Sequence, residues 1–385
     1  MSLKASQIPG KKLSSSSPSQ YDETVSKLLS AFPKDEKSRN ELLVNLGKWL
    51  VLIISLIGGT CVGVFYFYVQ IECQLLKSSW RLLGLMIALL PFVYYEYKKQ
   101  KDTYQYSREN LLNLQSWKTM FLATGGHSIW TVATLISVNY TSVAQSFLFL
   151  NLHAIMIVAY NILKKVPVSR PEVVGSLLAT FGTVFLAFDG NIHSSEGMVD
   201  LSKVTLFERI VYGDIVGLLG SVGAAFYFTK NAELKYDFPV YLGIFAMSVI
   251  GFFQISIASF ILEGSTFSFD PMNGLFGLFT QEWFVTYIYV VIITGYGAYV
   301  CYVFALKYFD ALLVSIVITL EPIVGAIIVF LLGWQSFPGP LTIIGFFVIL
   351  PGILIVTLGK SKRLNKESVS AKNSLKENQE PLINV

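Results

Sequence analysis

The chain has 385 residues, of which 53% are hydrophobic and only 14% are charged, whereas an ordinary soluble domain carries about 25% charged residues. This composition excludes a soluble enzyme, a nucleic-acid-binding protein and a disordered chain, and it predicts a helical protein that crosses a lipid bilayer several times. The net charge of +4 does not indicate a nucleic-acid partner, because the basic residues lie mainly in tails and short loops, where they orient a membrane protein.

The first 47 residues are polar, so we expect 1–47 to be a disordered tail without a cleavable signal peptide. Apolar segments follow that are each long enough to cross about 30 Å of hydrocarbon as helices. Ten such spans are expected, at 49–69, 80–97, 117–138, 143–163, 171–188, 213–228, 239–262, 283–306, 311–334 and 341–358.

An internal repeat divides these spans into two halves. Shifting the sequence by 170 residues places Thr124-Gly125 on Thr294-Gly295. The same shift aligns Leu150 with Leu320, Ile157 with Ile327, Gly175 with Gly345 and Gly182 with Gly352. Because each half has an odd number of spans, the halves must have opposite orientations in the bilayer. The expected fold is an all-α membrane protein with ten transmembrane helices in two inverted five-helix repeats, 48–190 and 212–360, joined by an outer loop at 191–211 and followed by a disordered tail at 361–385.

The basic residues predict the orientation. With the N-terminus in the cytosol, 25 of the 29 Lys and Arg residues fall on the cytosolic side, and the other four are Lys77, Arg81, Lys203 and Arg209. Positive residues concentrate on the cytosolic side of membrane proteins, so both termini are expected there. The pattern does not decide between the plasma membrane and an internal membrane.

Several stretches carry a likeness to a known family: Trp80-Arg81 with Leu90-Pro91, the span from Gly175 to Gly182, Gly213-Asp214, and Leu320-Glu321-Pro322-Ile323-Val324-Gly325-Ala326 leading to Gly345 through Gly352. Over about 48–360 the chain resembles the drug/metabolite transporter superfamily in its EamA-like form. The resemblance implies a ten-helix transporter with a central solute cavity and alternating access. It names no substrate, since relatives carry amino acids, sugars, nucleotide sugars, nucleobases and phosphorylated metabolites.

The chain departs from that family pattern in the first half. Leu152 stands where the second half has Pro322, so a kink in the fourth span that matches the one in the ninth is in doubt. After Gly333 the chain has Trp334-Gln335, where a Glu is common in the family. The stretch from Ala305 to Asp310 also resembles the nucleotide-sugar transporter branch.

Glu321 is the first candidate for a solute-binding residue. It lies midway along the ninth span and directly before Pro322, whose missing N–H leaves the carbonyl of Ile318 without its helical partner. A carboxylate at this depth is costly, so it could bind a proton or a cationic part of a substrate. The alternative is a structural hydrogen bond to a neighbouring helix.

The mid-membrane histidines are further candidates. His127 lies in the third span, and His153 lies in the fourth, two residues after Asn151. Imidazole could bind solute or relay protons, but a histidine that bonds a neighbouring helix explains both positions equally simply. On a regular helix, Asn151 and His153 could not both face the cavity squarely.

Aromatic and polar residues complete the candidate site: Trp130 and Tyr299, which could stack on a solute or pack between helices, and Gln145, which could line the outer half of the cavity. Tyr296 and Tyr302 flank Tyr299 at spacings of three residues. We expect Arg81 to extend to the membrane interface, with capture of an anionic solute as the alternative.

The sequence has no Walker loop, no metal-ligand pair and no nucleophile elbow. We therefore expect no enzyme, no cofactor and no bound metal. The predicted function is secondary transport of a small organic solute by alternating access. The alternatives are a non-transporting membrane scaffold or receptor and a nucleotide-sugar-type antiporter of the same superfamily. The expected partners are a small-molecule solute and the lipid bilayer, and the sequence leaves a homodimer open.

Overall fold

The computed structural model describes residues 36–188 and 206–377, except 70, 72, 141, 142, 235, 236 and 334–336. The chain divides into two compact units, 1–49 and 50–385, and the second unit holds every residue of the candidate site described below. No strand occurs among the described residues. Their longer helices are α2 (Glu36–Tyr68), α3 (Gln74–Gln100), α5 (Leu114–Tyr140), α6 (Val143–Leu150), α7 (His153–Leu163), α8 (Arg170–Ala187), α9 (Leu206–Glu233), α10 (Val240–Leu262), α13 (Ala311–Ile318), α14 (Glu321–Leu331) and α15 (Pro340–Glu377).

Seven helical segments of the described chain are long and apolar enough to cross a membrane, and a shorter apolar helix covers Leu148–Leu163. The prediction of an all-helical, multi-pass membrane protein is therefore confirmed. The seven segments are Asn40–Val62, Gln74–Gln100, Val211–Glu233, Val240–Leu262, Gln281–Tyr308, Ala311–Ile328 and Pro340–Lys360.

Two apolar helical stretches are each interrupted by two residues. α6 ends at Leu150 and α7 begins at His153, while α13 ends at Ile318 and α14 begins at Glu321. At both interruptions the backbone tightens into bonds between residues three apart, from Leu152 N–H to the Phe149 carbonyl (3.2 Å) and from Leu320 N–H to the Val317 carbonyl (3.1 Å). The helical stretch 143–163 is thus interrupted at Asn151–Leu152 although it lacks a proline there.

A third helical stretch changes its winding. Between α11 (Phe284–Tyr289) and α12 (Cys301–Tyr308) the chain forms the π-helical segment η4, Val290–Val300. π-Helical turns are uncommon and concentrate at functional sites. Tyr296 and Tyr299 lie in this segment and Tyr302 lies just after it, in α12, and each meets a different partner, as described below.

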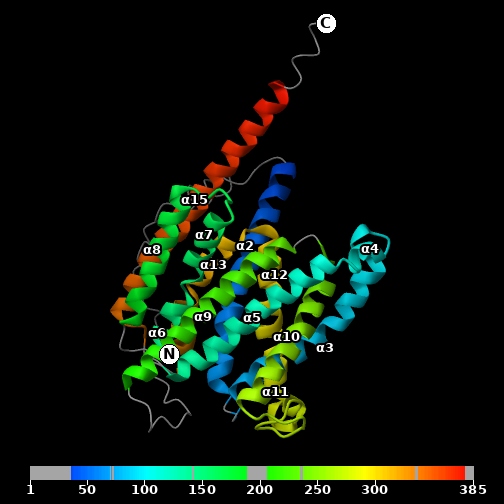
Figure 1. Ribbon diagram of the computed structural model, residues 1–385, viewed down its shortest axis with the longest axis vertical. Coiled ribbons are helices and arrows are strands. Elements are labelled where there is room, and N and C mark those ends of the chain that lie inside the picture. The colour runs from blue at the N-terminus through cyan, green and yellow to red at the C-terminus, as the bar shows by residue number, and fades with distance from the viewer. Residues whose placement is uncertain are drawn as a thin grey trace, which may run out of the picture. The chain divides into compact units, whose positions relative to one another are not determined.

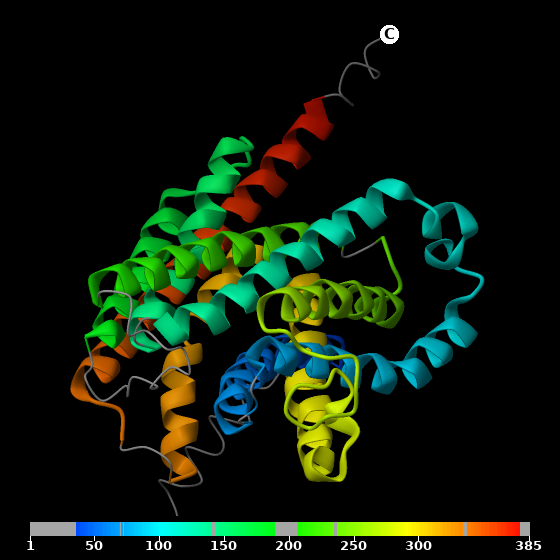
Figure 2. The ribbon, with the colours of Figure 1, turned by 60° about the horizontal axis from the view of Figure 1, so that its bottom comes forward.

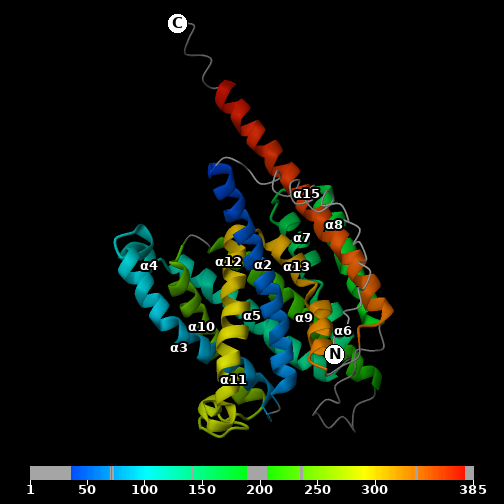
Figure 3. The same cartoon turned by 180° about the vertical axis from the view of Figure 1, so that it is seen from behind.

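Helices from opposite halves of the chain pack in pairs. α5 packs along α9, α8 packs along α15 and α3 packs along α10. Figures 1 and 2 show α8 beside the long C-terminal helix α15, and Figure 3 shows the same pair from behind. Each pair joins helices that are more than 60 residues apart in sequence.

Glycines allow the closest of these approaches. A Cβ on Gly126 of α5 would lie 2.7 Å from the carbonyl oxygen of Gly223 on α9, which is closer than real Cβ atoms come. Between α8 and α15, a Cβ on Gly175 would lie 2.6 Å from the Gly352 carbonyl oxygen, and one on Gly182 would lie 3.0 Å from that of Gly345. The backbones therefore touch where lipid-embedded helices commonly carry small residues.

The α3–α10 pair has a carboxylate at each end. Glu96, near the end of α3, accepts hydrogen bonds from the N–H groups of Val240, Tyr241 and Leu242 at the start of α10 (2.8, 2.9 and 3.1 Å). Glu263, directly after α10, accepts from the N–H of Leu75 at the start of α3 (2.9 Å). Burial raises the pKa of the Glu263 carboxyl, and these hydrogen bonds oppose that rise. Each helix thus supplies the acid that caps the other helix.

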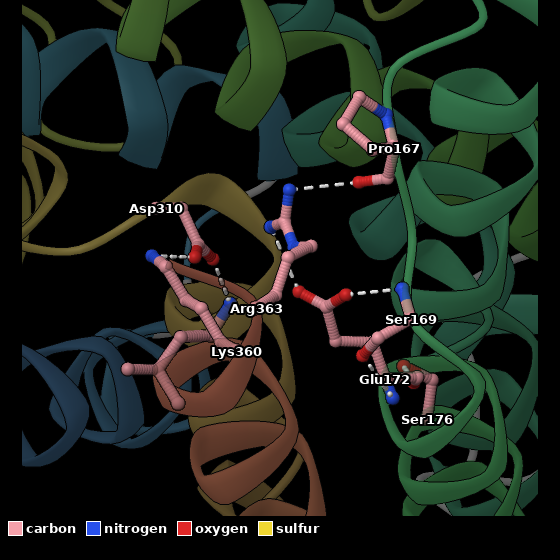
Figure 4. Close-up of polar contacts among 8 residues, drawn as sticks. Pro167, Ser169, Glu172, Ser176, Asp310, Lys360 and Arg363 are labelled. Carbon is pink, nitrogen blue, oxygen red and sulfur yellow. Dashed lines mark hydrogen bonds and ion pairs between the residues drawn. The ribbon is translucent and has the colours of Figure 1, made fainter. Parts of the chain in front are cut away.

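A second group of charges ties α15 to its neighbours (Figure 4). Glu172 accepts a hydrogen bond from the Ser169 N–H (2.6 Å) and pairs with Arg363 (2.9 Å), whose guanidinium also donates to the Pro167 carbonyl (2.8 Å). Asp310 accepts from the Leu313 N–H at the start of α13 and forms an ion pair with Lys360. Two basic residues of α15 therefore bind acids that cap α8 and α13.

The ends of the predicted domains differ from the structure. α15 continues to Glu377 and α2 begins at Glu36, so helix extends into both segments expected as disordered tails. α9 begins at Leu206, inside the expected loop 191–211, so the helix includes the charged residues Glu208 and Arg209 ahead of its apolar part. Residues 1–35, 191–205 and 378–385 lie outside the described part of the chain.

Candidate functional site

A cluster of aromatic rings lies between α5, α7, α9 and η4. The His127 ring is 4.9 Å from Tyr299, 5.2 Å from Tyr227 and 6.2 Å from Trp130, measured between centroids. Trp130 in turn lies 6.1 Å from His153. The structure thus brings together four of the residues expected at the site, His127 and Trp130 of α5, His153 of α7 and Tyr299 of η4.

His153 also makes a bond between helices. Its Nδ1 lies 2.8 Å from the hydroxyl of Ser315 on α13, and its side chain is 1% exposed. This contact fits the structural interpretation of a histidine that joins neighbouring helices. Its Nε2 is buried and has no hydrogen-bond partner among the described residues, so one nitrogen of the ring remains free to bind.

Glu321 is held by the neighbouring helices. It is the first residue of α14, directly after the break, and its Oε1 accepts a hydrogen bond from the hydroxyl of Tyr302 on α12. A Cβ at position 59 of α2 would collide with the Tyr302 hydroxyl and with Glu321 Oε1. Gly59 has no side chain and therefore leaves room for this hydrogen-bonded pair. The Thr60 hydroxyl reaches the backbone carbonyl of Glu321 at 3.4 Å. The carboxylate therefore lies where α2, α12 and the broken span meet.

Arg81 corrects an expectation from the sequence. It was expected to extend to the membrane interface, but its side chain is 5% exposed and lies inside the bundle. Its guanidinium interacts electrostatically with His127, Tyr299 and Glu321. The physical reason is that the other helices enclose this face of α3, so the stem of the arginine has no path along the protein surface.

Unpaired polar atoms gather around this arginine. Among the described residues, Arg81 Nε, His127 Nδ1 and the Tyr299 hydroxyl are buried without a hydrogen-bond partner. Folded proteins pair the great majority of buried polar atoms, so each exception calls for an explanation. Arg81, His127 and Tyr299 are therefore candidates for binding groups.

The remaining two candidates, Asn151 and Gln145, are not part of the aromatic cluster. Asn151 lies in the break between α6 and α7, is 5% exposed, and has an Nδ2 without a partner among the described residues. Because the helix is interrupted there, the argument that Asn151 and His153 cannot share a face does not apply. Gln145 lies in α6, and its side chain is outside the described part of the structure.

The three tyrosines spaced by three residues, Tyr296, Tyr299 and Tyr302, make different contacts. Tyr302 bonds Glu321, Tyr299 joins the aromatic cluster, and the Tyr296 hydroxyl donates to the Ala88 carbonyl of α3 at 3.1 Å. Sequence reasoning missed Tyr302 and Tyr227 as site residues. The spacing of three did mark Tyr302 as a neighbour of Tyr299, whereas Tyr227 carried no signal beyond its place in an apolar span.

The part of the chain that the structure describes contains no group of three His, Cys, Asp or Glu side chains that could hold a metal ion. Its polar groups can instead donate hydrogen bonds through Arg81, His127 and Tyr299, and accept them through Glu321. Such a set suits a small polar solute.

Comparisons with known proteins bear on the fold alone. No family model matches the sequence, and no curated protein matches it. A solved protein crystal structure matches at a TM-score of 0.58 over 81% of this chain and 97% of its own length, with 14% sequence identity. The chain therefore has a fold that is known among solved structures, and its multi-pass helical architecture places it in the class of integral membrane proteins.

Proposed function

We propose that the protein is a secondary transporter that moves a small organic solute across a membrane by alternating access. One observation carries this proposal: buried polar side chains from α3, α5, η4 and α14 meet inside a set of apolar helices, and several of their atoms lack a partner among the described residues. Polar groups at membrane depth are costly and are typical of substrate pathways.

The broken helices support the proposal. Transporters place solute sites beside discontinuous helices, whose free backbone groups and helix ends can bind a ligand. Here both breaks adjoin candidate residues, with Asn151 and His153 at the first and Glu321 at the second. A membrane scaffold has no need of such interruptions.

The packing glycines support the proposed inverted repeat. The shift of 170 residues maps Gly175 onto Gly345 and Gly182 onto Gly352. It therefore maps the Gly175–Gly352 approach onto the Gly182–Gly345 approach, and both occur. A two-fold axis between the halves requires this exchange. The mutual capping by Glu96 and Glu263 fits the same axis.

On this proposal the ten predicted spans form two inverted repeats of five, related to the drug/metabolite transporter superfamily, with both termini in the cytosol. The solute site lies between the halves, which rock to expose it to one side at a time. A nucleotide-sugar-type antiporter is a special case of this mechanism and would carry its solutes in strict exchange.

An uptake screen on purified protein in vesicles tests the proposal. Vesicles that contain the protein should accumulate at least one member of a panel of labelled amino acids, sugars, nucleobases and organic anions faster than protein-free vesicles. Gly126→Ala, which should separate α5 from α9, serves as the impaired control, and Gly125→Ala serves as its neutral partner. Absence of uptake for the whole panel by folded protein would favour the scaffold or receptor.

A further inference from the structure

Two buried cations lie one helical turn apart on α3 and differ in their surroundings. Lys77 is 1% exposed and interacts electrostatically with Glu263, the acid that caps its own helix. Arg81 is 5% exposed, and no hydrogen bond or ion pair joins its guanidinium to any residue of the described chain. Each cation therefore has an acid nearby, Glu263 for Lys77 and Glu321 for Arg81, and Arg81 Nε has no hydrogen-bond partner among the described residues.

The acid that could pair with Arg81, Glu321, already accepts a hydrogen bond from another residue. Glu321 interacts electrostatically with Arg81, but it accepts its hydrogen bond from Tyr302 and forms no ion pair with the arginine in the described structure. An arginine cannot shed its proton in a protein, so a buried guanidinium without a partner is strongly destabilising. A planar fork of donors is matched geometrically by a carboxylate or a phosphate.

The neighbours of Arg81 add further donors. The Tyr299 hydroxyl and His127 Nδ1 are both buried without a partner among the described residues, and the guanidinium interacts electrostatically with both side chains. Their rings meet edge to face, with centroids 4.9 Å apart and an interplanar angle of 80°. The surroundings of the arginine are thus rich in hydrogen-bond donors and lined with aromatic rings.

We propose that Arg81 is the anion-binding residue of the transport site, and that the solute is a small organic anion that carries a carboxylate or a phosphate. The anionic group binds the guanidinium, with Tyr299 and His127 as additional donors. This inference rests on the proposed transport function, because it names the class of solute for that same site.

Binding to the full-length protein in detergent tests the inference without any transport step. The probes are benzoate and phenyl phosphate, with benzamide as the uncharged analogue of benzoate. Isothermal titration should show that wild-type protein binds at least one of the two anions about tenfold or more tightly than benzamide, since charge-assisted hydrogen bonds are about twice as strong as neutral ones. Equal binding of all three probes, or binding of none, would overturn the inference.

Substitutions at Arg81, with Lys77 as the control position, test which residue gives the preference for anions. Arg81→Gln should abolish the preference for the anions, and Arg81→Lys should retain part of it, because the lysine keeps the charge but loses the fork. Lys77→Gln, on the same helix one turn away, should leave the preference unchanged. If Arg81→Gln does not fold, Tyr299→Phe should weaken anion binding about threefold or more and benzamide binding less. An anion preference that depends on Lys77 rather than Arg81 would contradict the proposal.

The outcome also separates this inference from the proposed function. Flux of neutral or cationic solutes by a protein without an anion preference would leave transport standing and remove the role of Arg81. Anion binding that depends on Arg81, with no flux of any solute in vesicles, would support the role of Arg81 and contradict the proposed transport function.

Discussion

Tyr302 and Glu321 form the best-defined polar pair in the membrane-depth part of the site. The tyrosine hydroxyl donates to the carboxylate, and the missing side chain of Gly59 leaves room for both. The sequence singled out Glu321 because a carboxylate inside an apolar span is rare, and in the structure the candidates His127, Trp130, His153 and Tyr299 lie close together. The sequence alone could not predict that Arg81 is buried. The direction of a side chain near the end of a span depends on which helices pack against that span.

Removing the charge at position 321 should impair transport and leave the protein folded. Glu321→Gln keeps the shape of the side chain but weakens its hydrogen bond with Tyr302, and bonds to charged groups contribute about 1.5–3 kcal/mol. Because 1.4 kcal/mol corresponds to about a tenfold change, we expect uptake in vesicles to fall by about tenfold. Normal uptake at unchanged protein levels would limit Glu321 to a structural role.

Stability measurements should show that Tyr302 and Glu321 are coupled. Tyr302→Phe leaves a buried carboxylate short of a donor and should lower the free energy of unfolding by about 1–3 kcal/mol. In the Glu321→Gln background the loss should be smaller by about 0.5 kcal/mol or more. Tyr296→Phe loses a bond to the Ala88 carbonyl instead, so its effect should add to that of Glu321→Gln. Strict additivity for Tyr302 would mean that the pair does not interact.

At the scale of elements, the helices and their approximate limits follow from hydropathy, while the interruptions within them do not. Periodicity cannot place the break at Asn151–Leu152, because Leu152 carries no breaking signal and the first half has no proline there. The π-helical winding of η4 likewise depends on packing against α2 and α3 and has no local signature. The structure also identifies which glycines allow close helix approach, with Gly126 against Gly223, Gly175 against Gly352 and Gly182 against Gly345.

Neighbouring glycines of α5 provide a matched test of helix packing. Alanine at Gly126 would place its Cβ 2.7 Å from the Gly223 carbonyl oxygen, whereas the Cβ of an alanine at Gly125 would lie 3.9 Å from Gln254 Nε2, an ordinary van der Waals contact. Overpacking typically costs about 1–3 kcal/mol, so thermal unfolding of purified Gly126→Ala should begin several degrees lower. Gly125→Ala should be neutral or slightly stabilising, since alanine favours helix by up to about 1 kcal/mol. Equal effects of the two substitutions would show that α5 and α9 do not approach closely at Gly126.

At the scale of the whole molecule, composition was sufficient to establish a multi-pass helical membrane protein, and the pairing of helices across the two halves is what the structure adds. Pairing of α8 with α15 and of α3 with α10 joins distant segments, and no span contains information about its partner beyond its small residues. The repeat, the ten-span count and the orientation belong to the proposed function, which makes them open to direct test.

The topology can be tested with reporters. Tags at the N-terminus and the C-terminus should both report from the cytosol, because 25 of the 29 basic residues lie on that side in a ten-span arrangement. A tag within 191–205 should report from the opposite side. If that tag and the C-terminal tag report from the same side, the ten-span arrangement is wrong.

Alternating access is the central claim, and trans-stimulation in reconstituted vesicles tests it most directly. A labelled solute found in the uptake screen is added outside vesicles that are either empty or loaded with the same unlabelled solute, and electrical conductance is recorded in parallel. A carrier that exposes its site to one side at a time should take up label several-fold faster into loaded vesicles, without channel-like conductance. Equal uptake by loaded and empty vesicles together with channel-like conductance would contradict alternating access, since an open pore does not require the site to return.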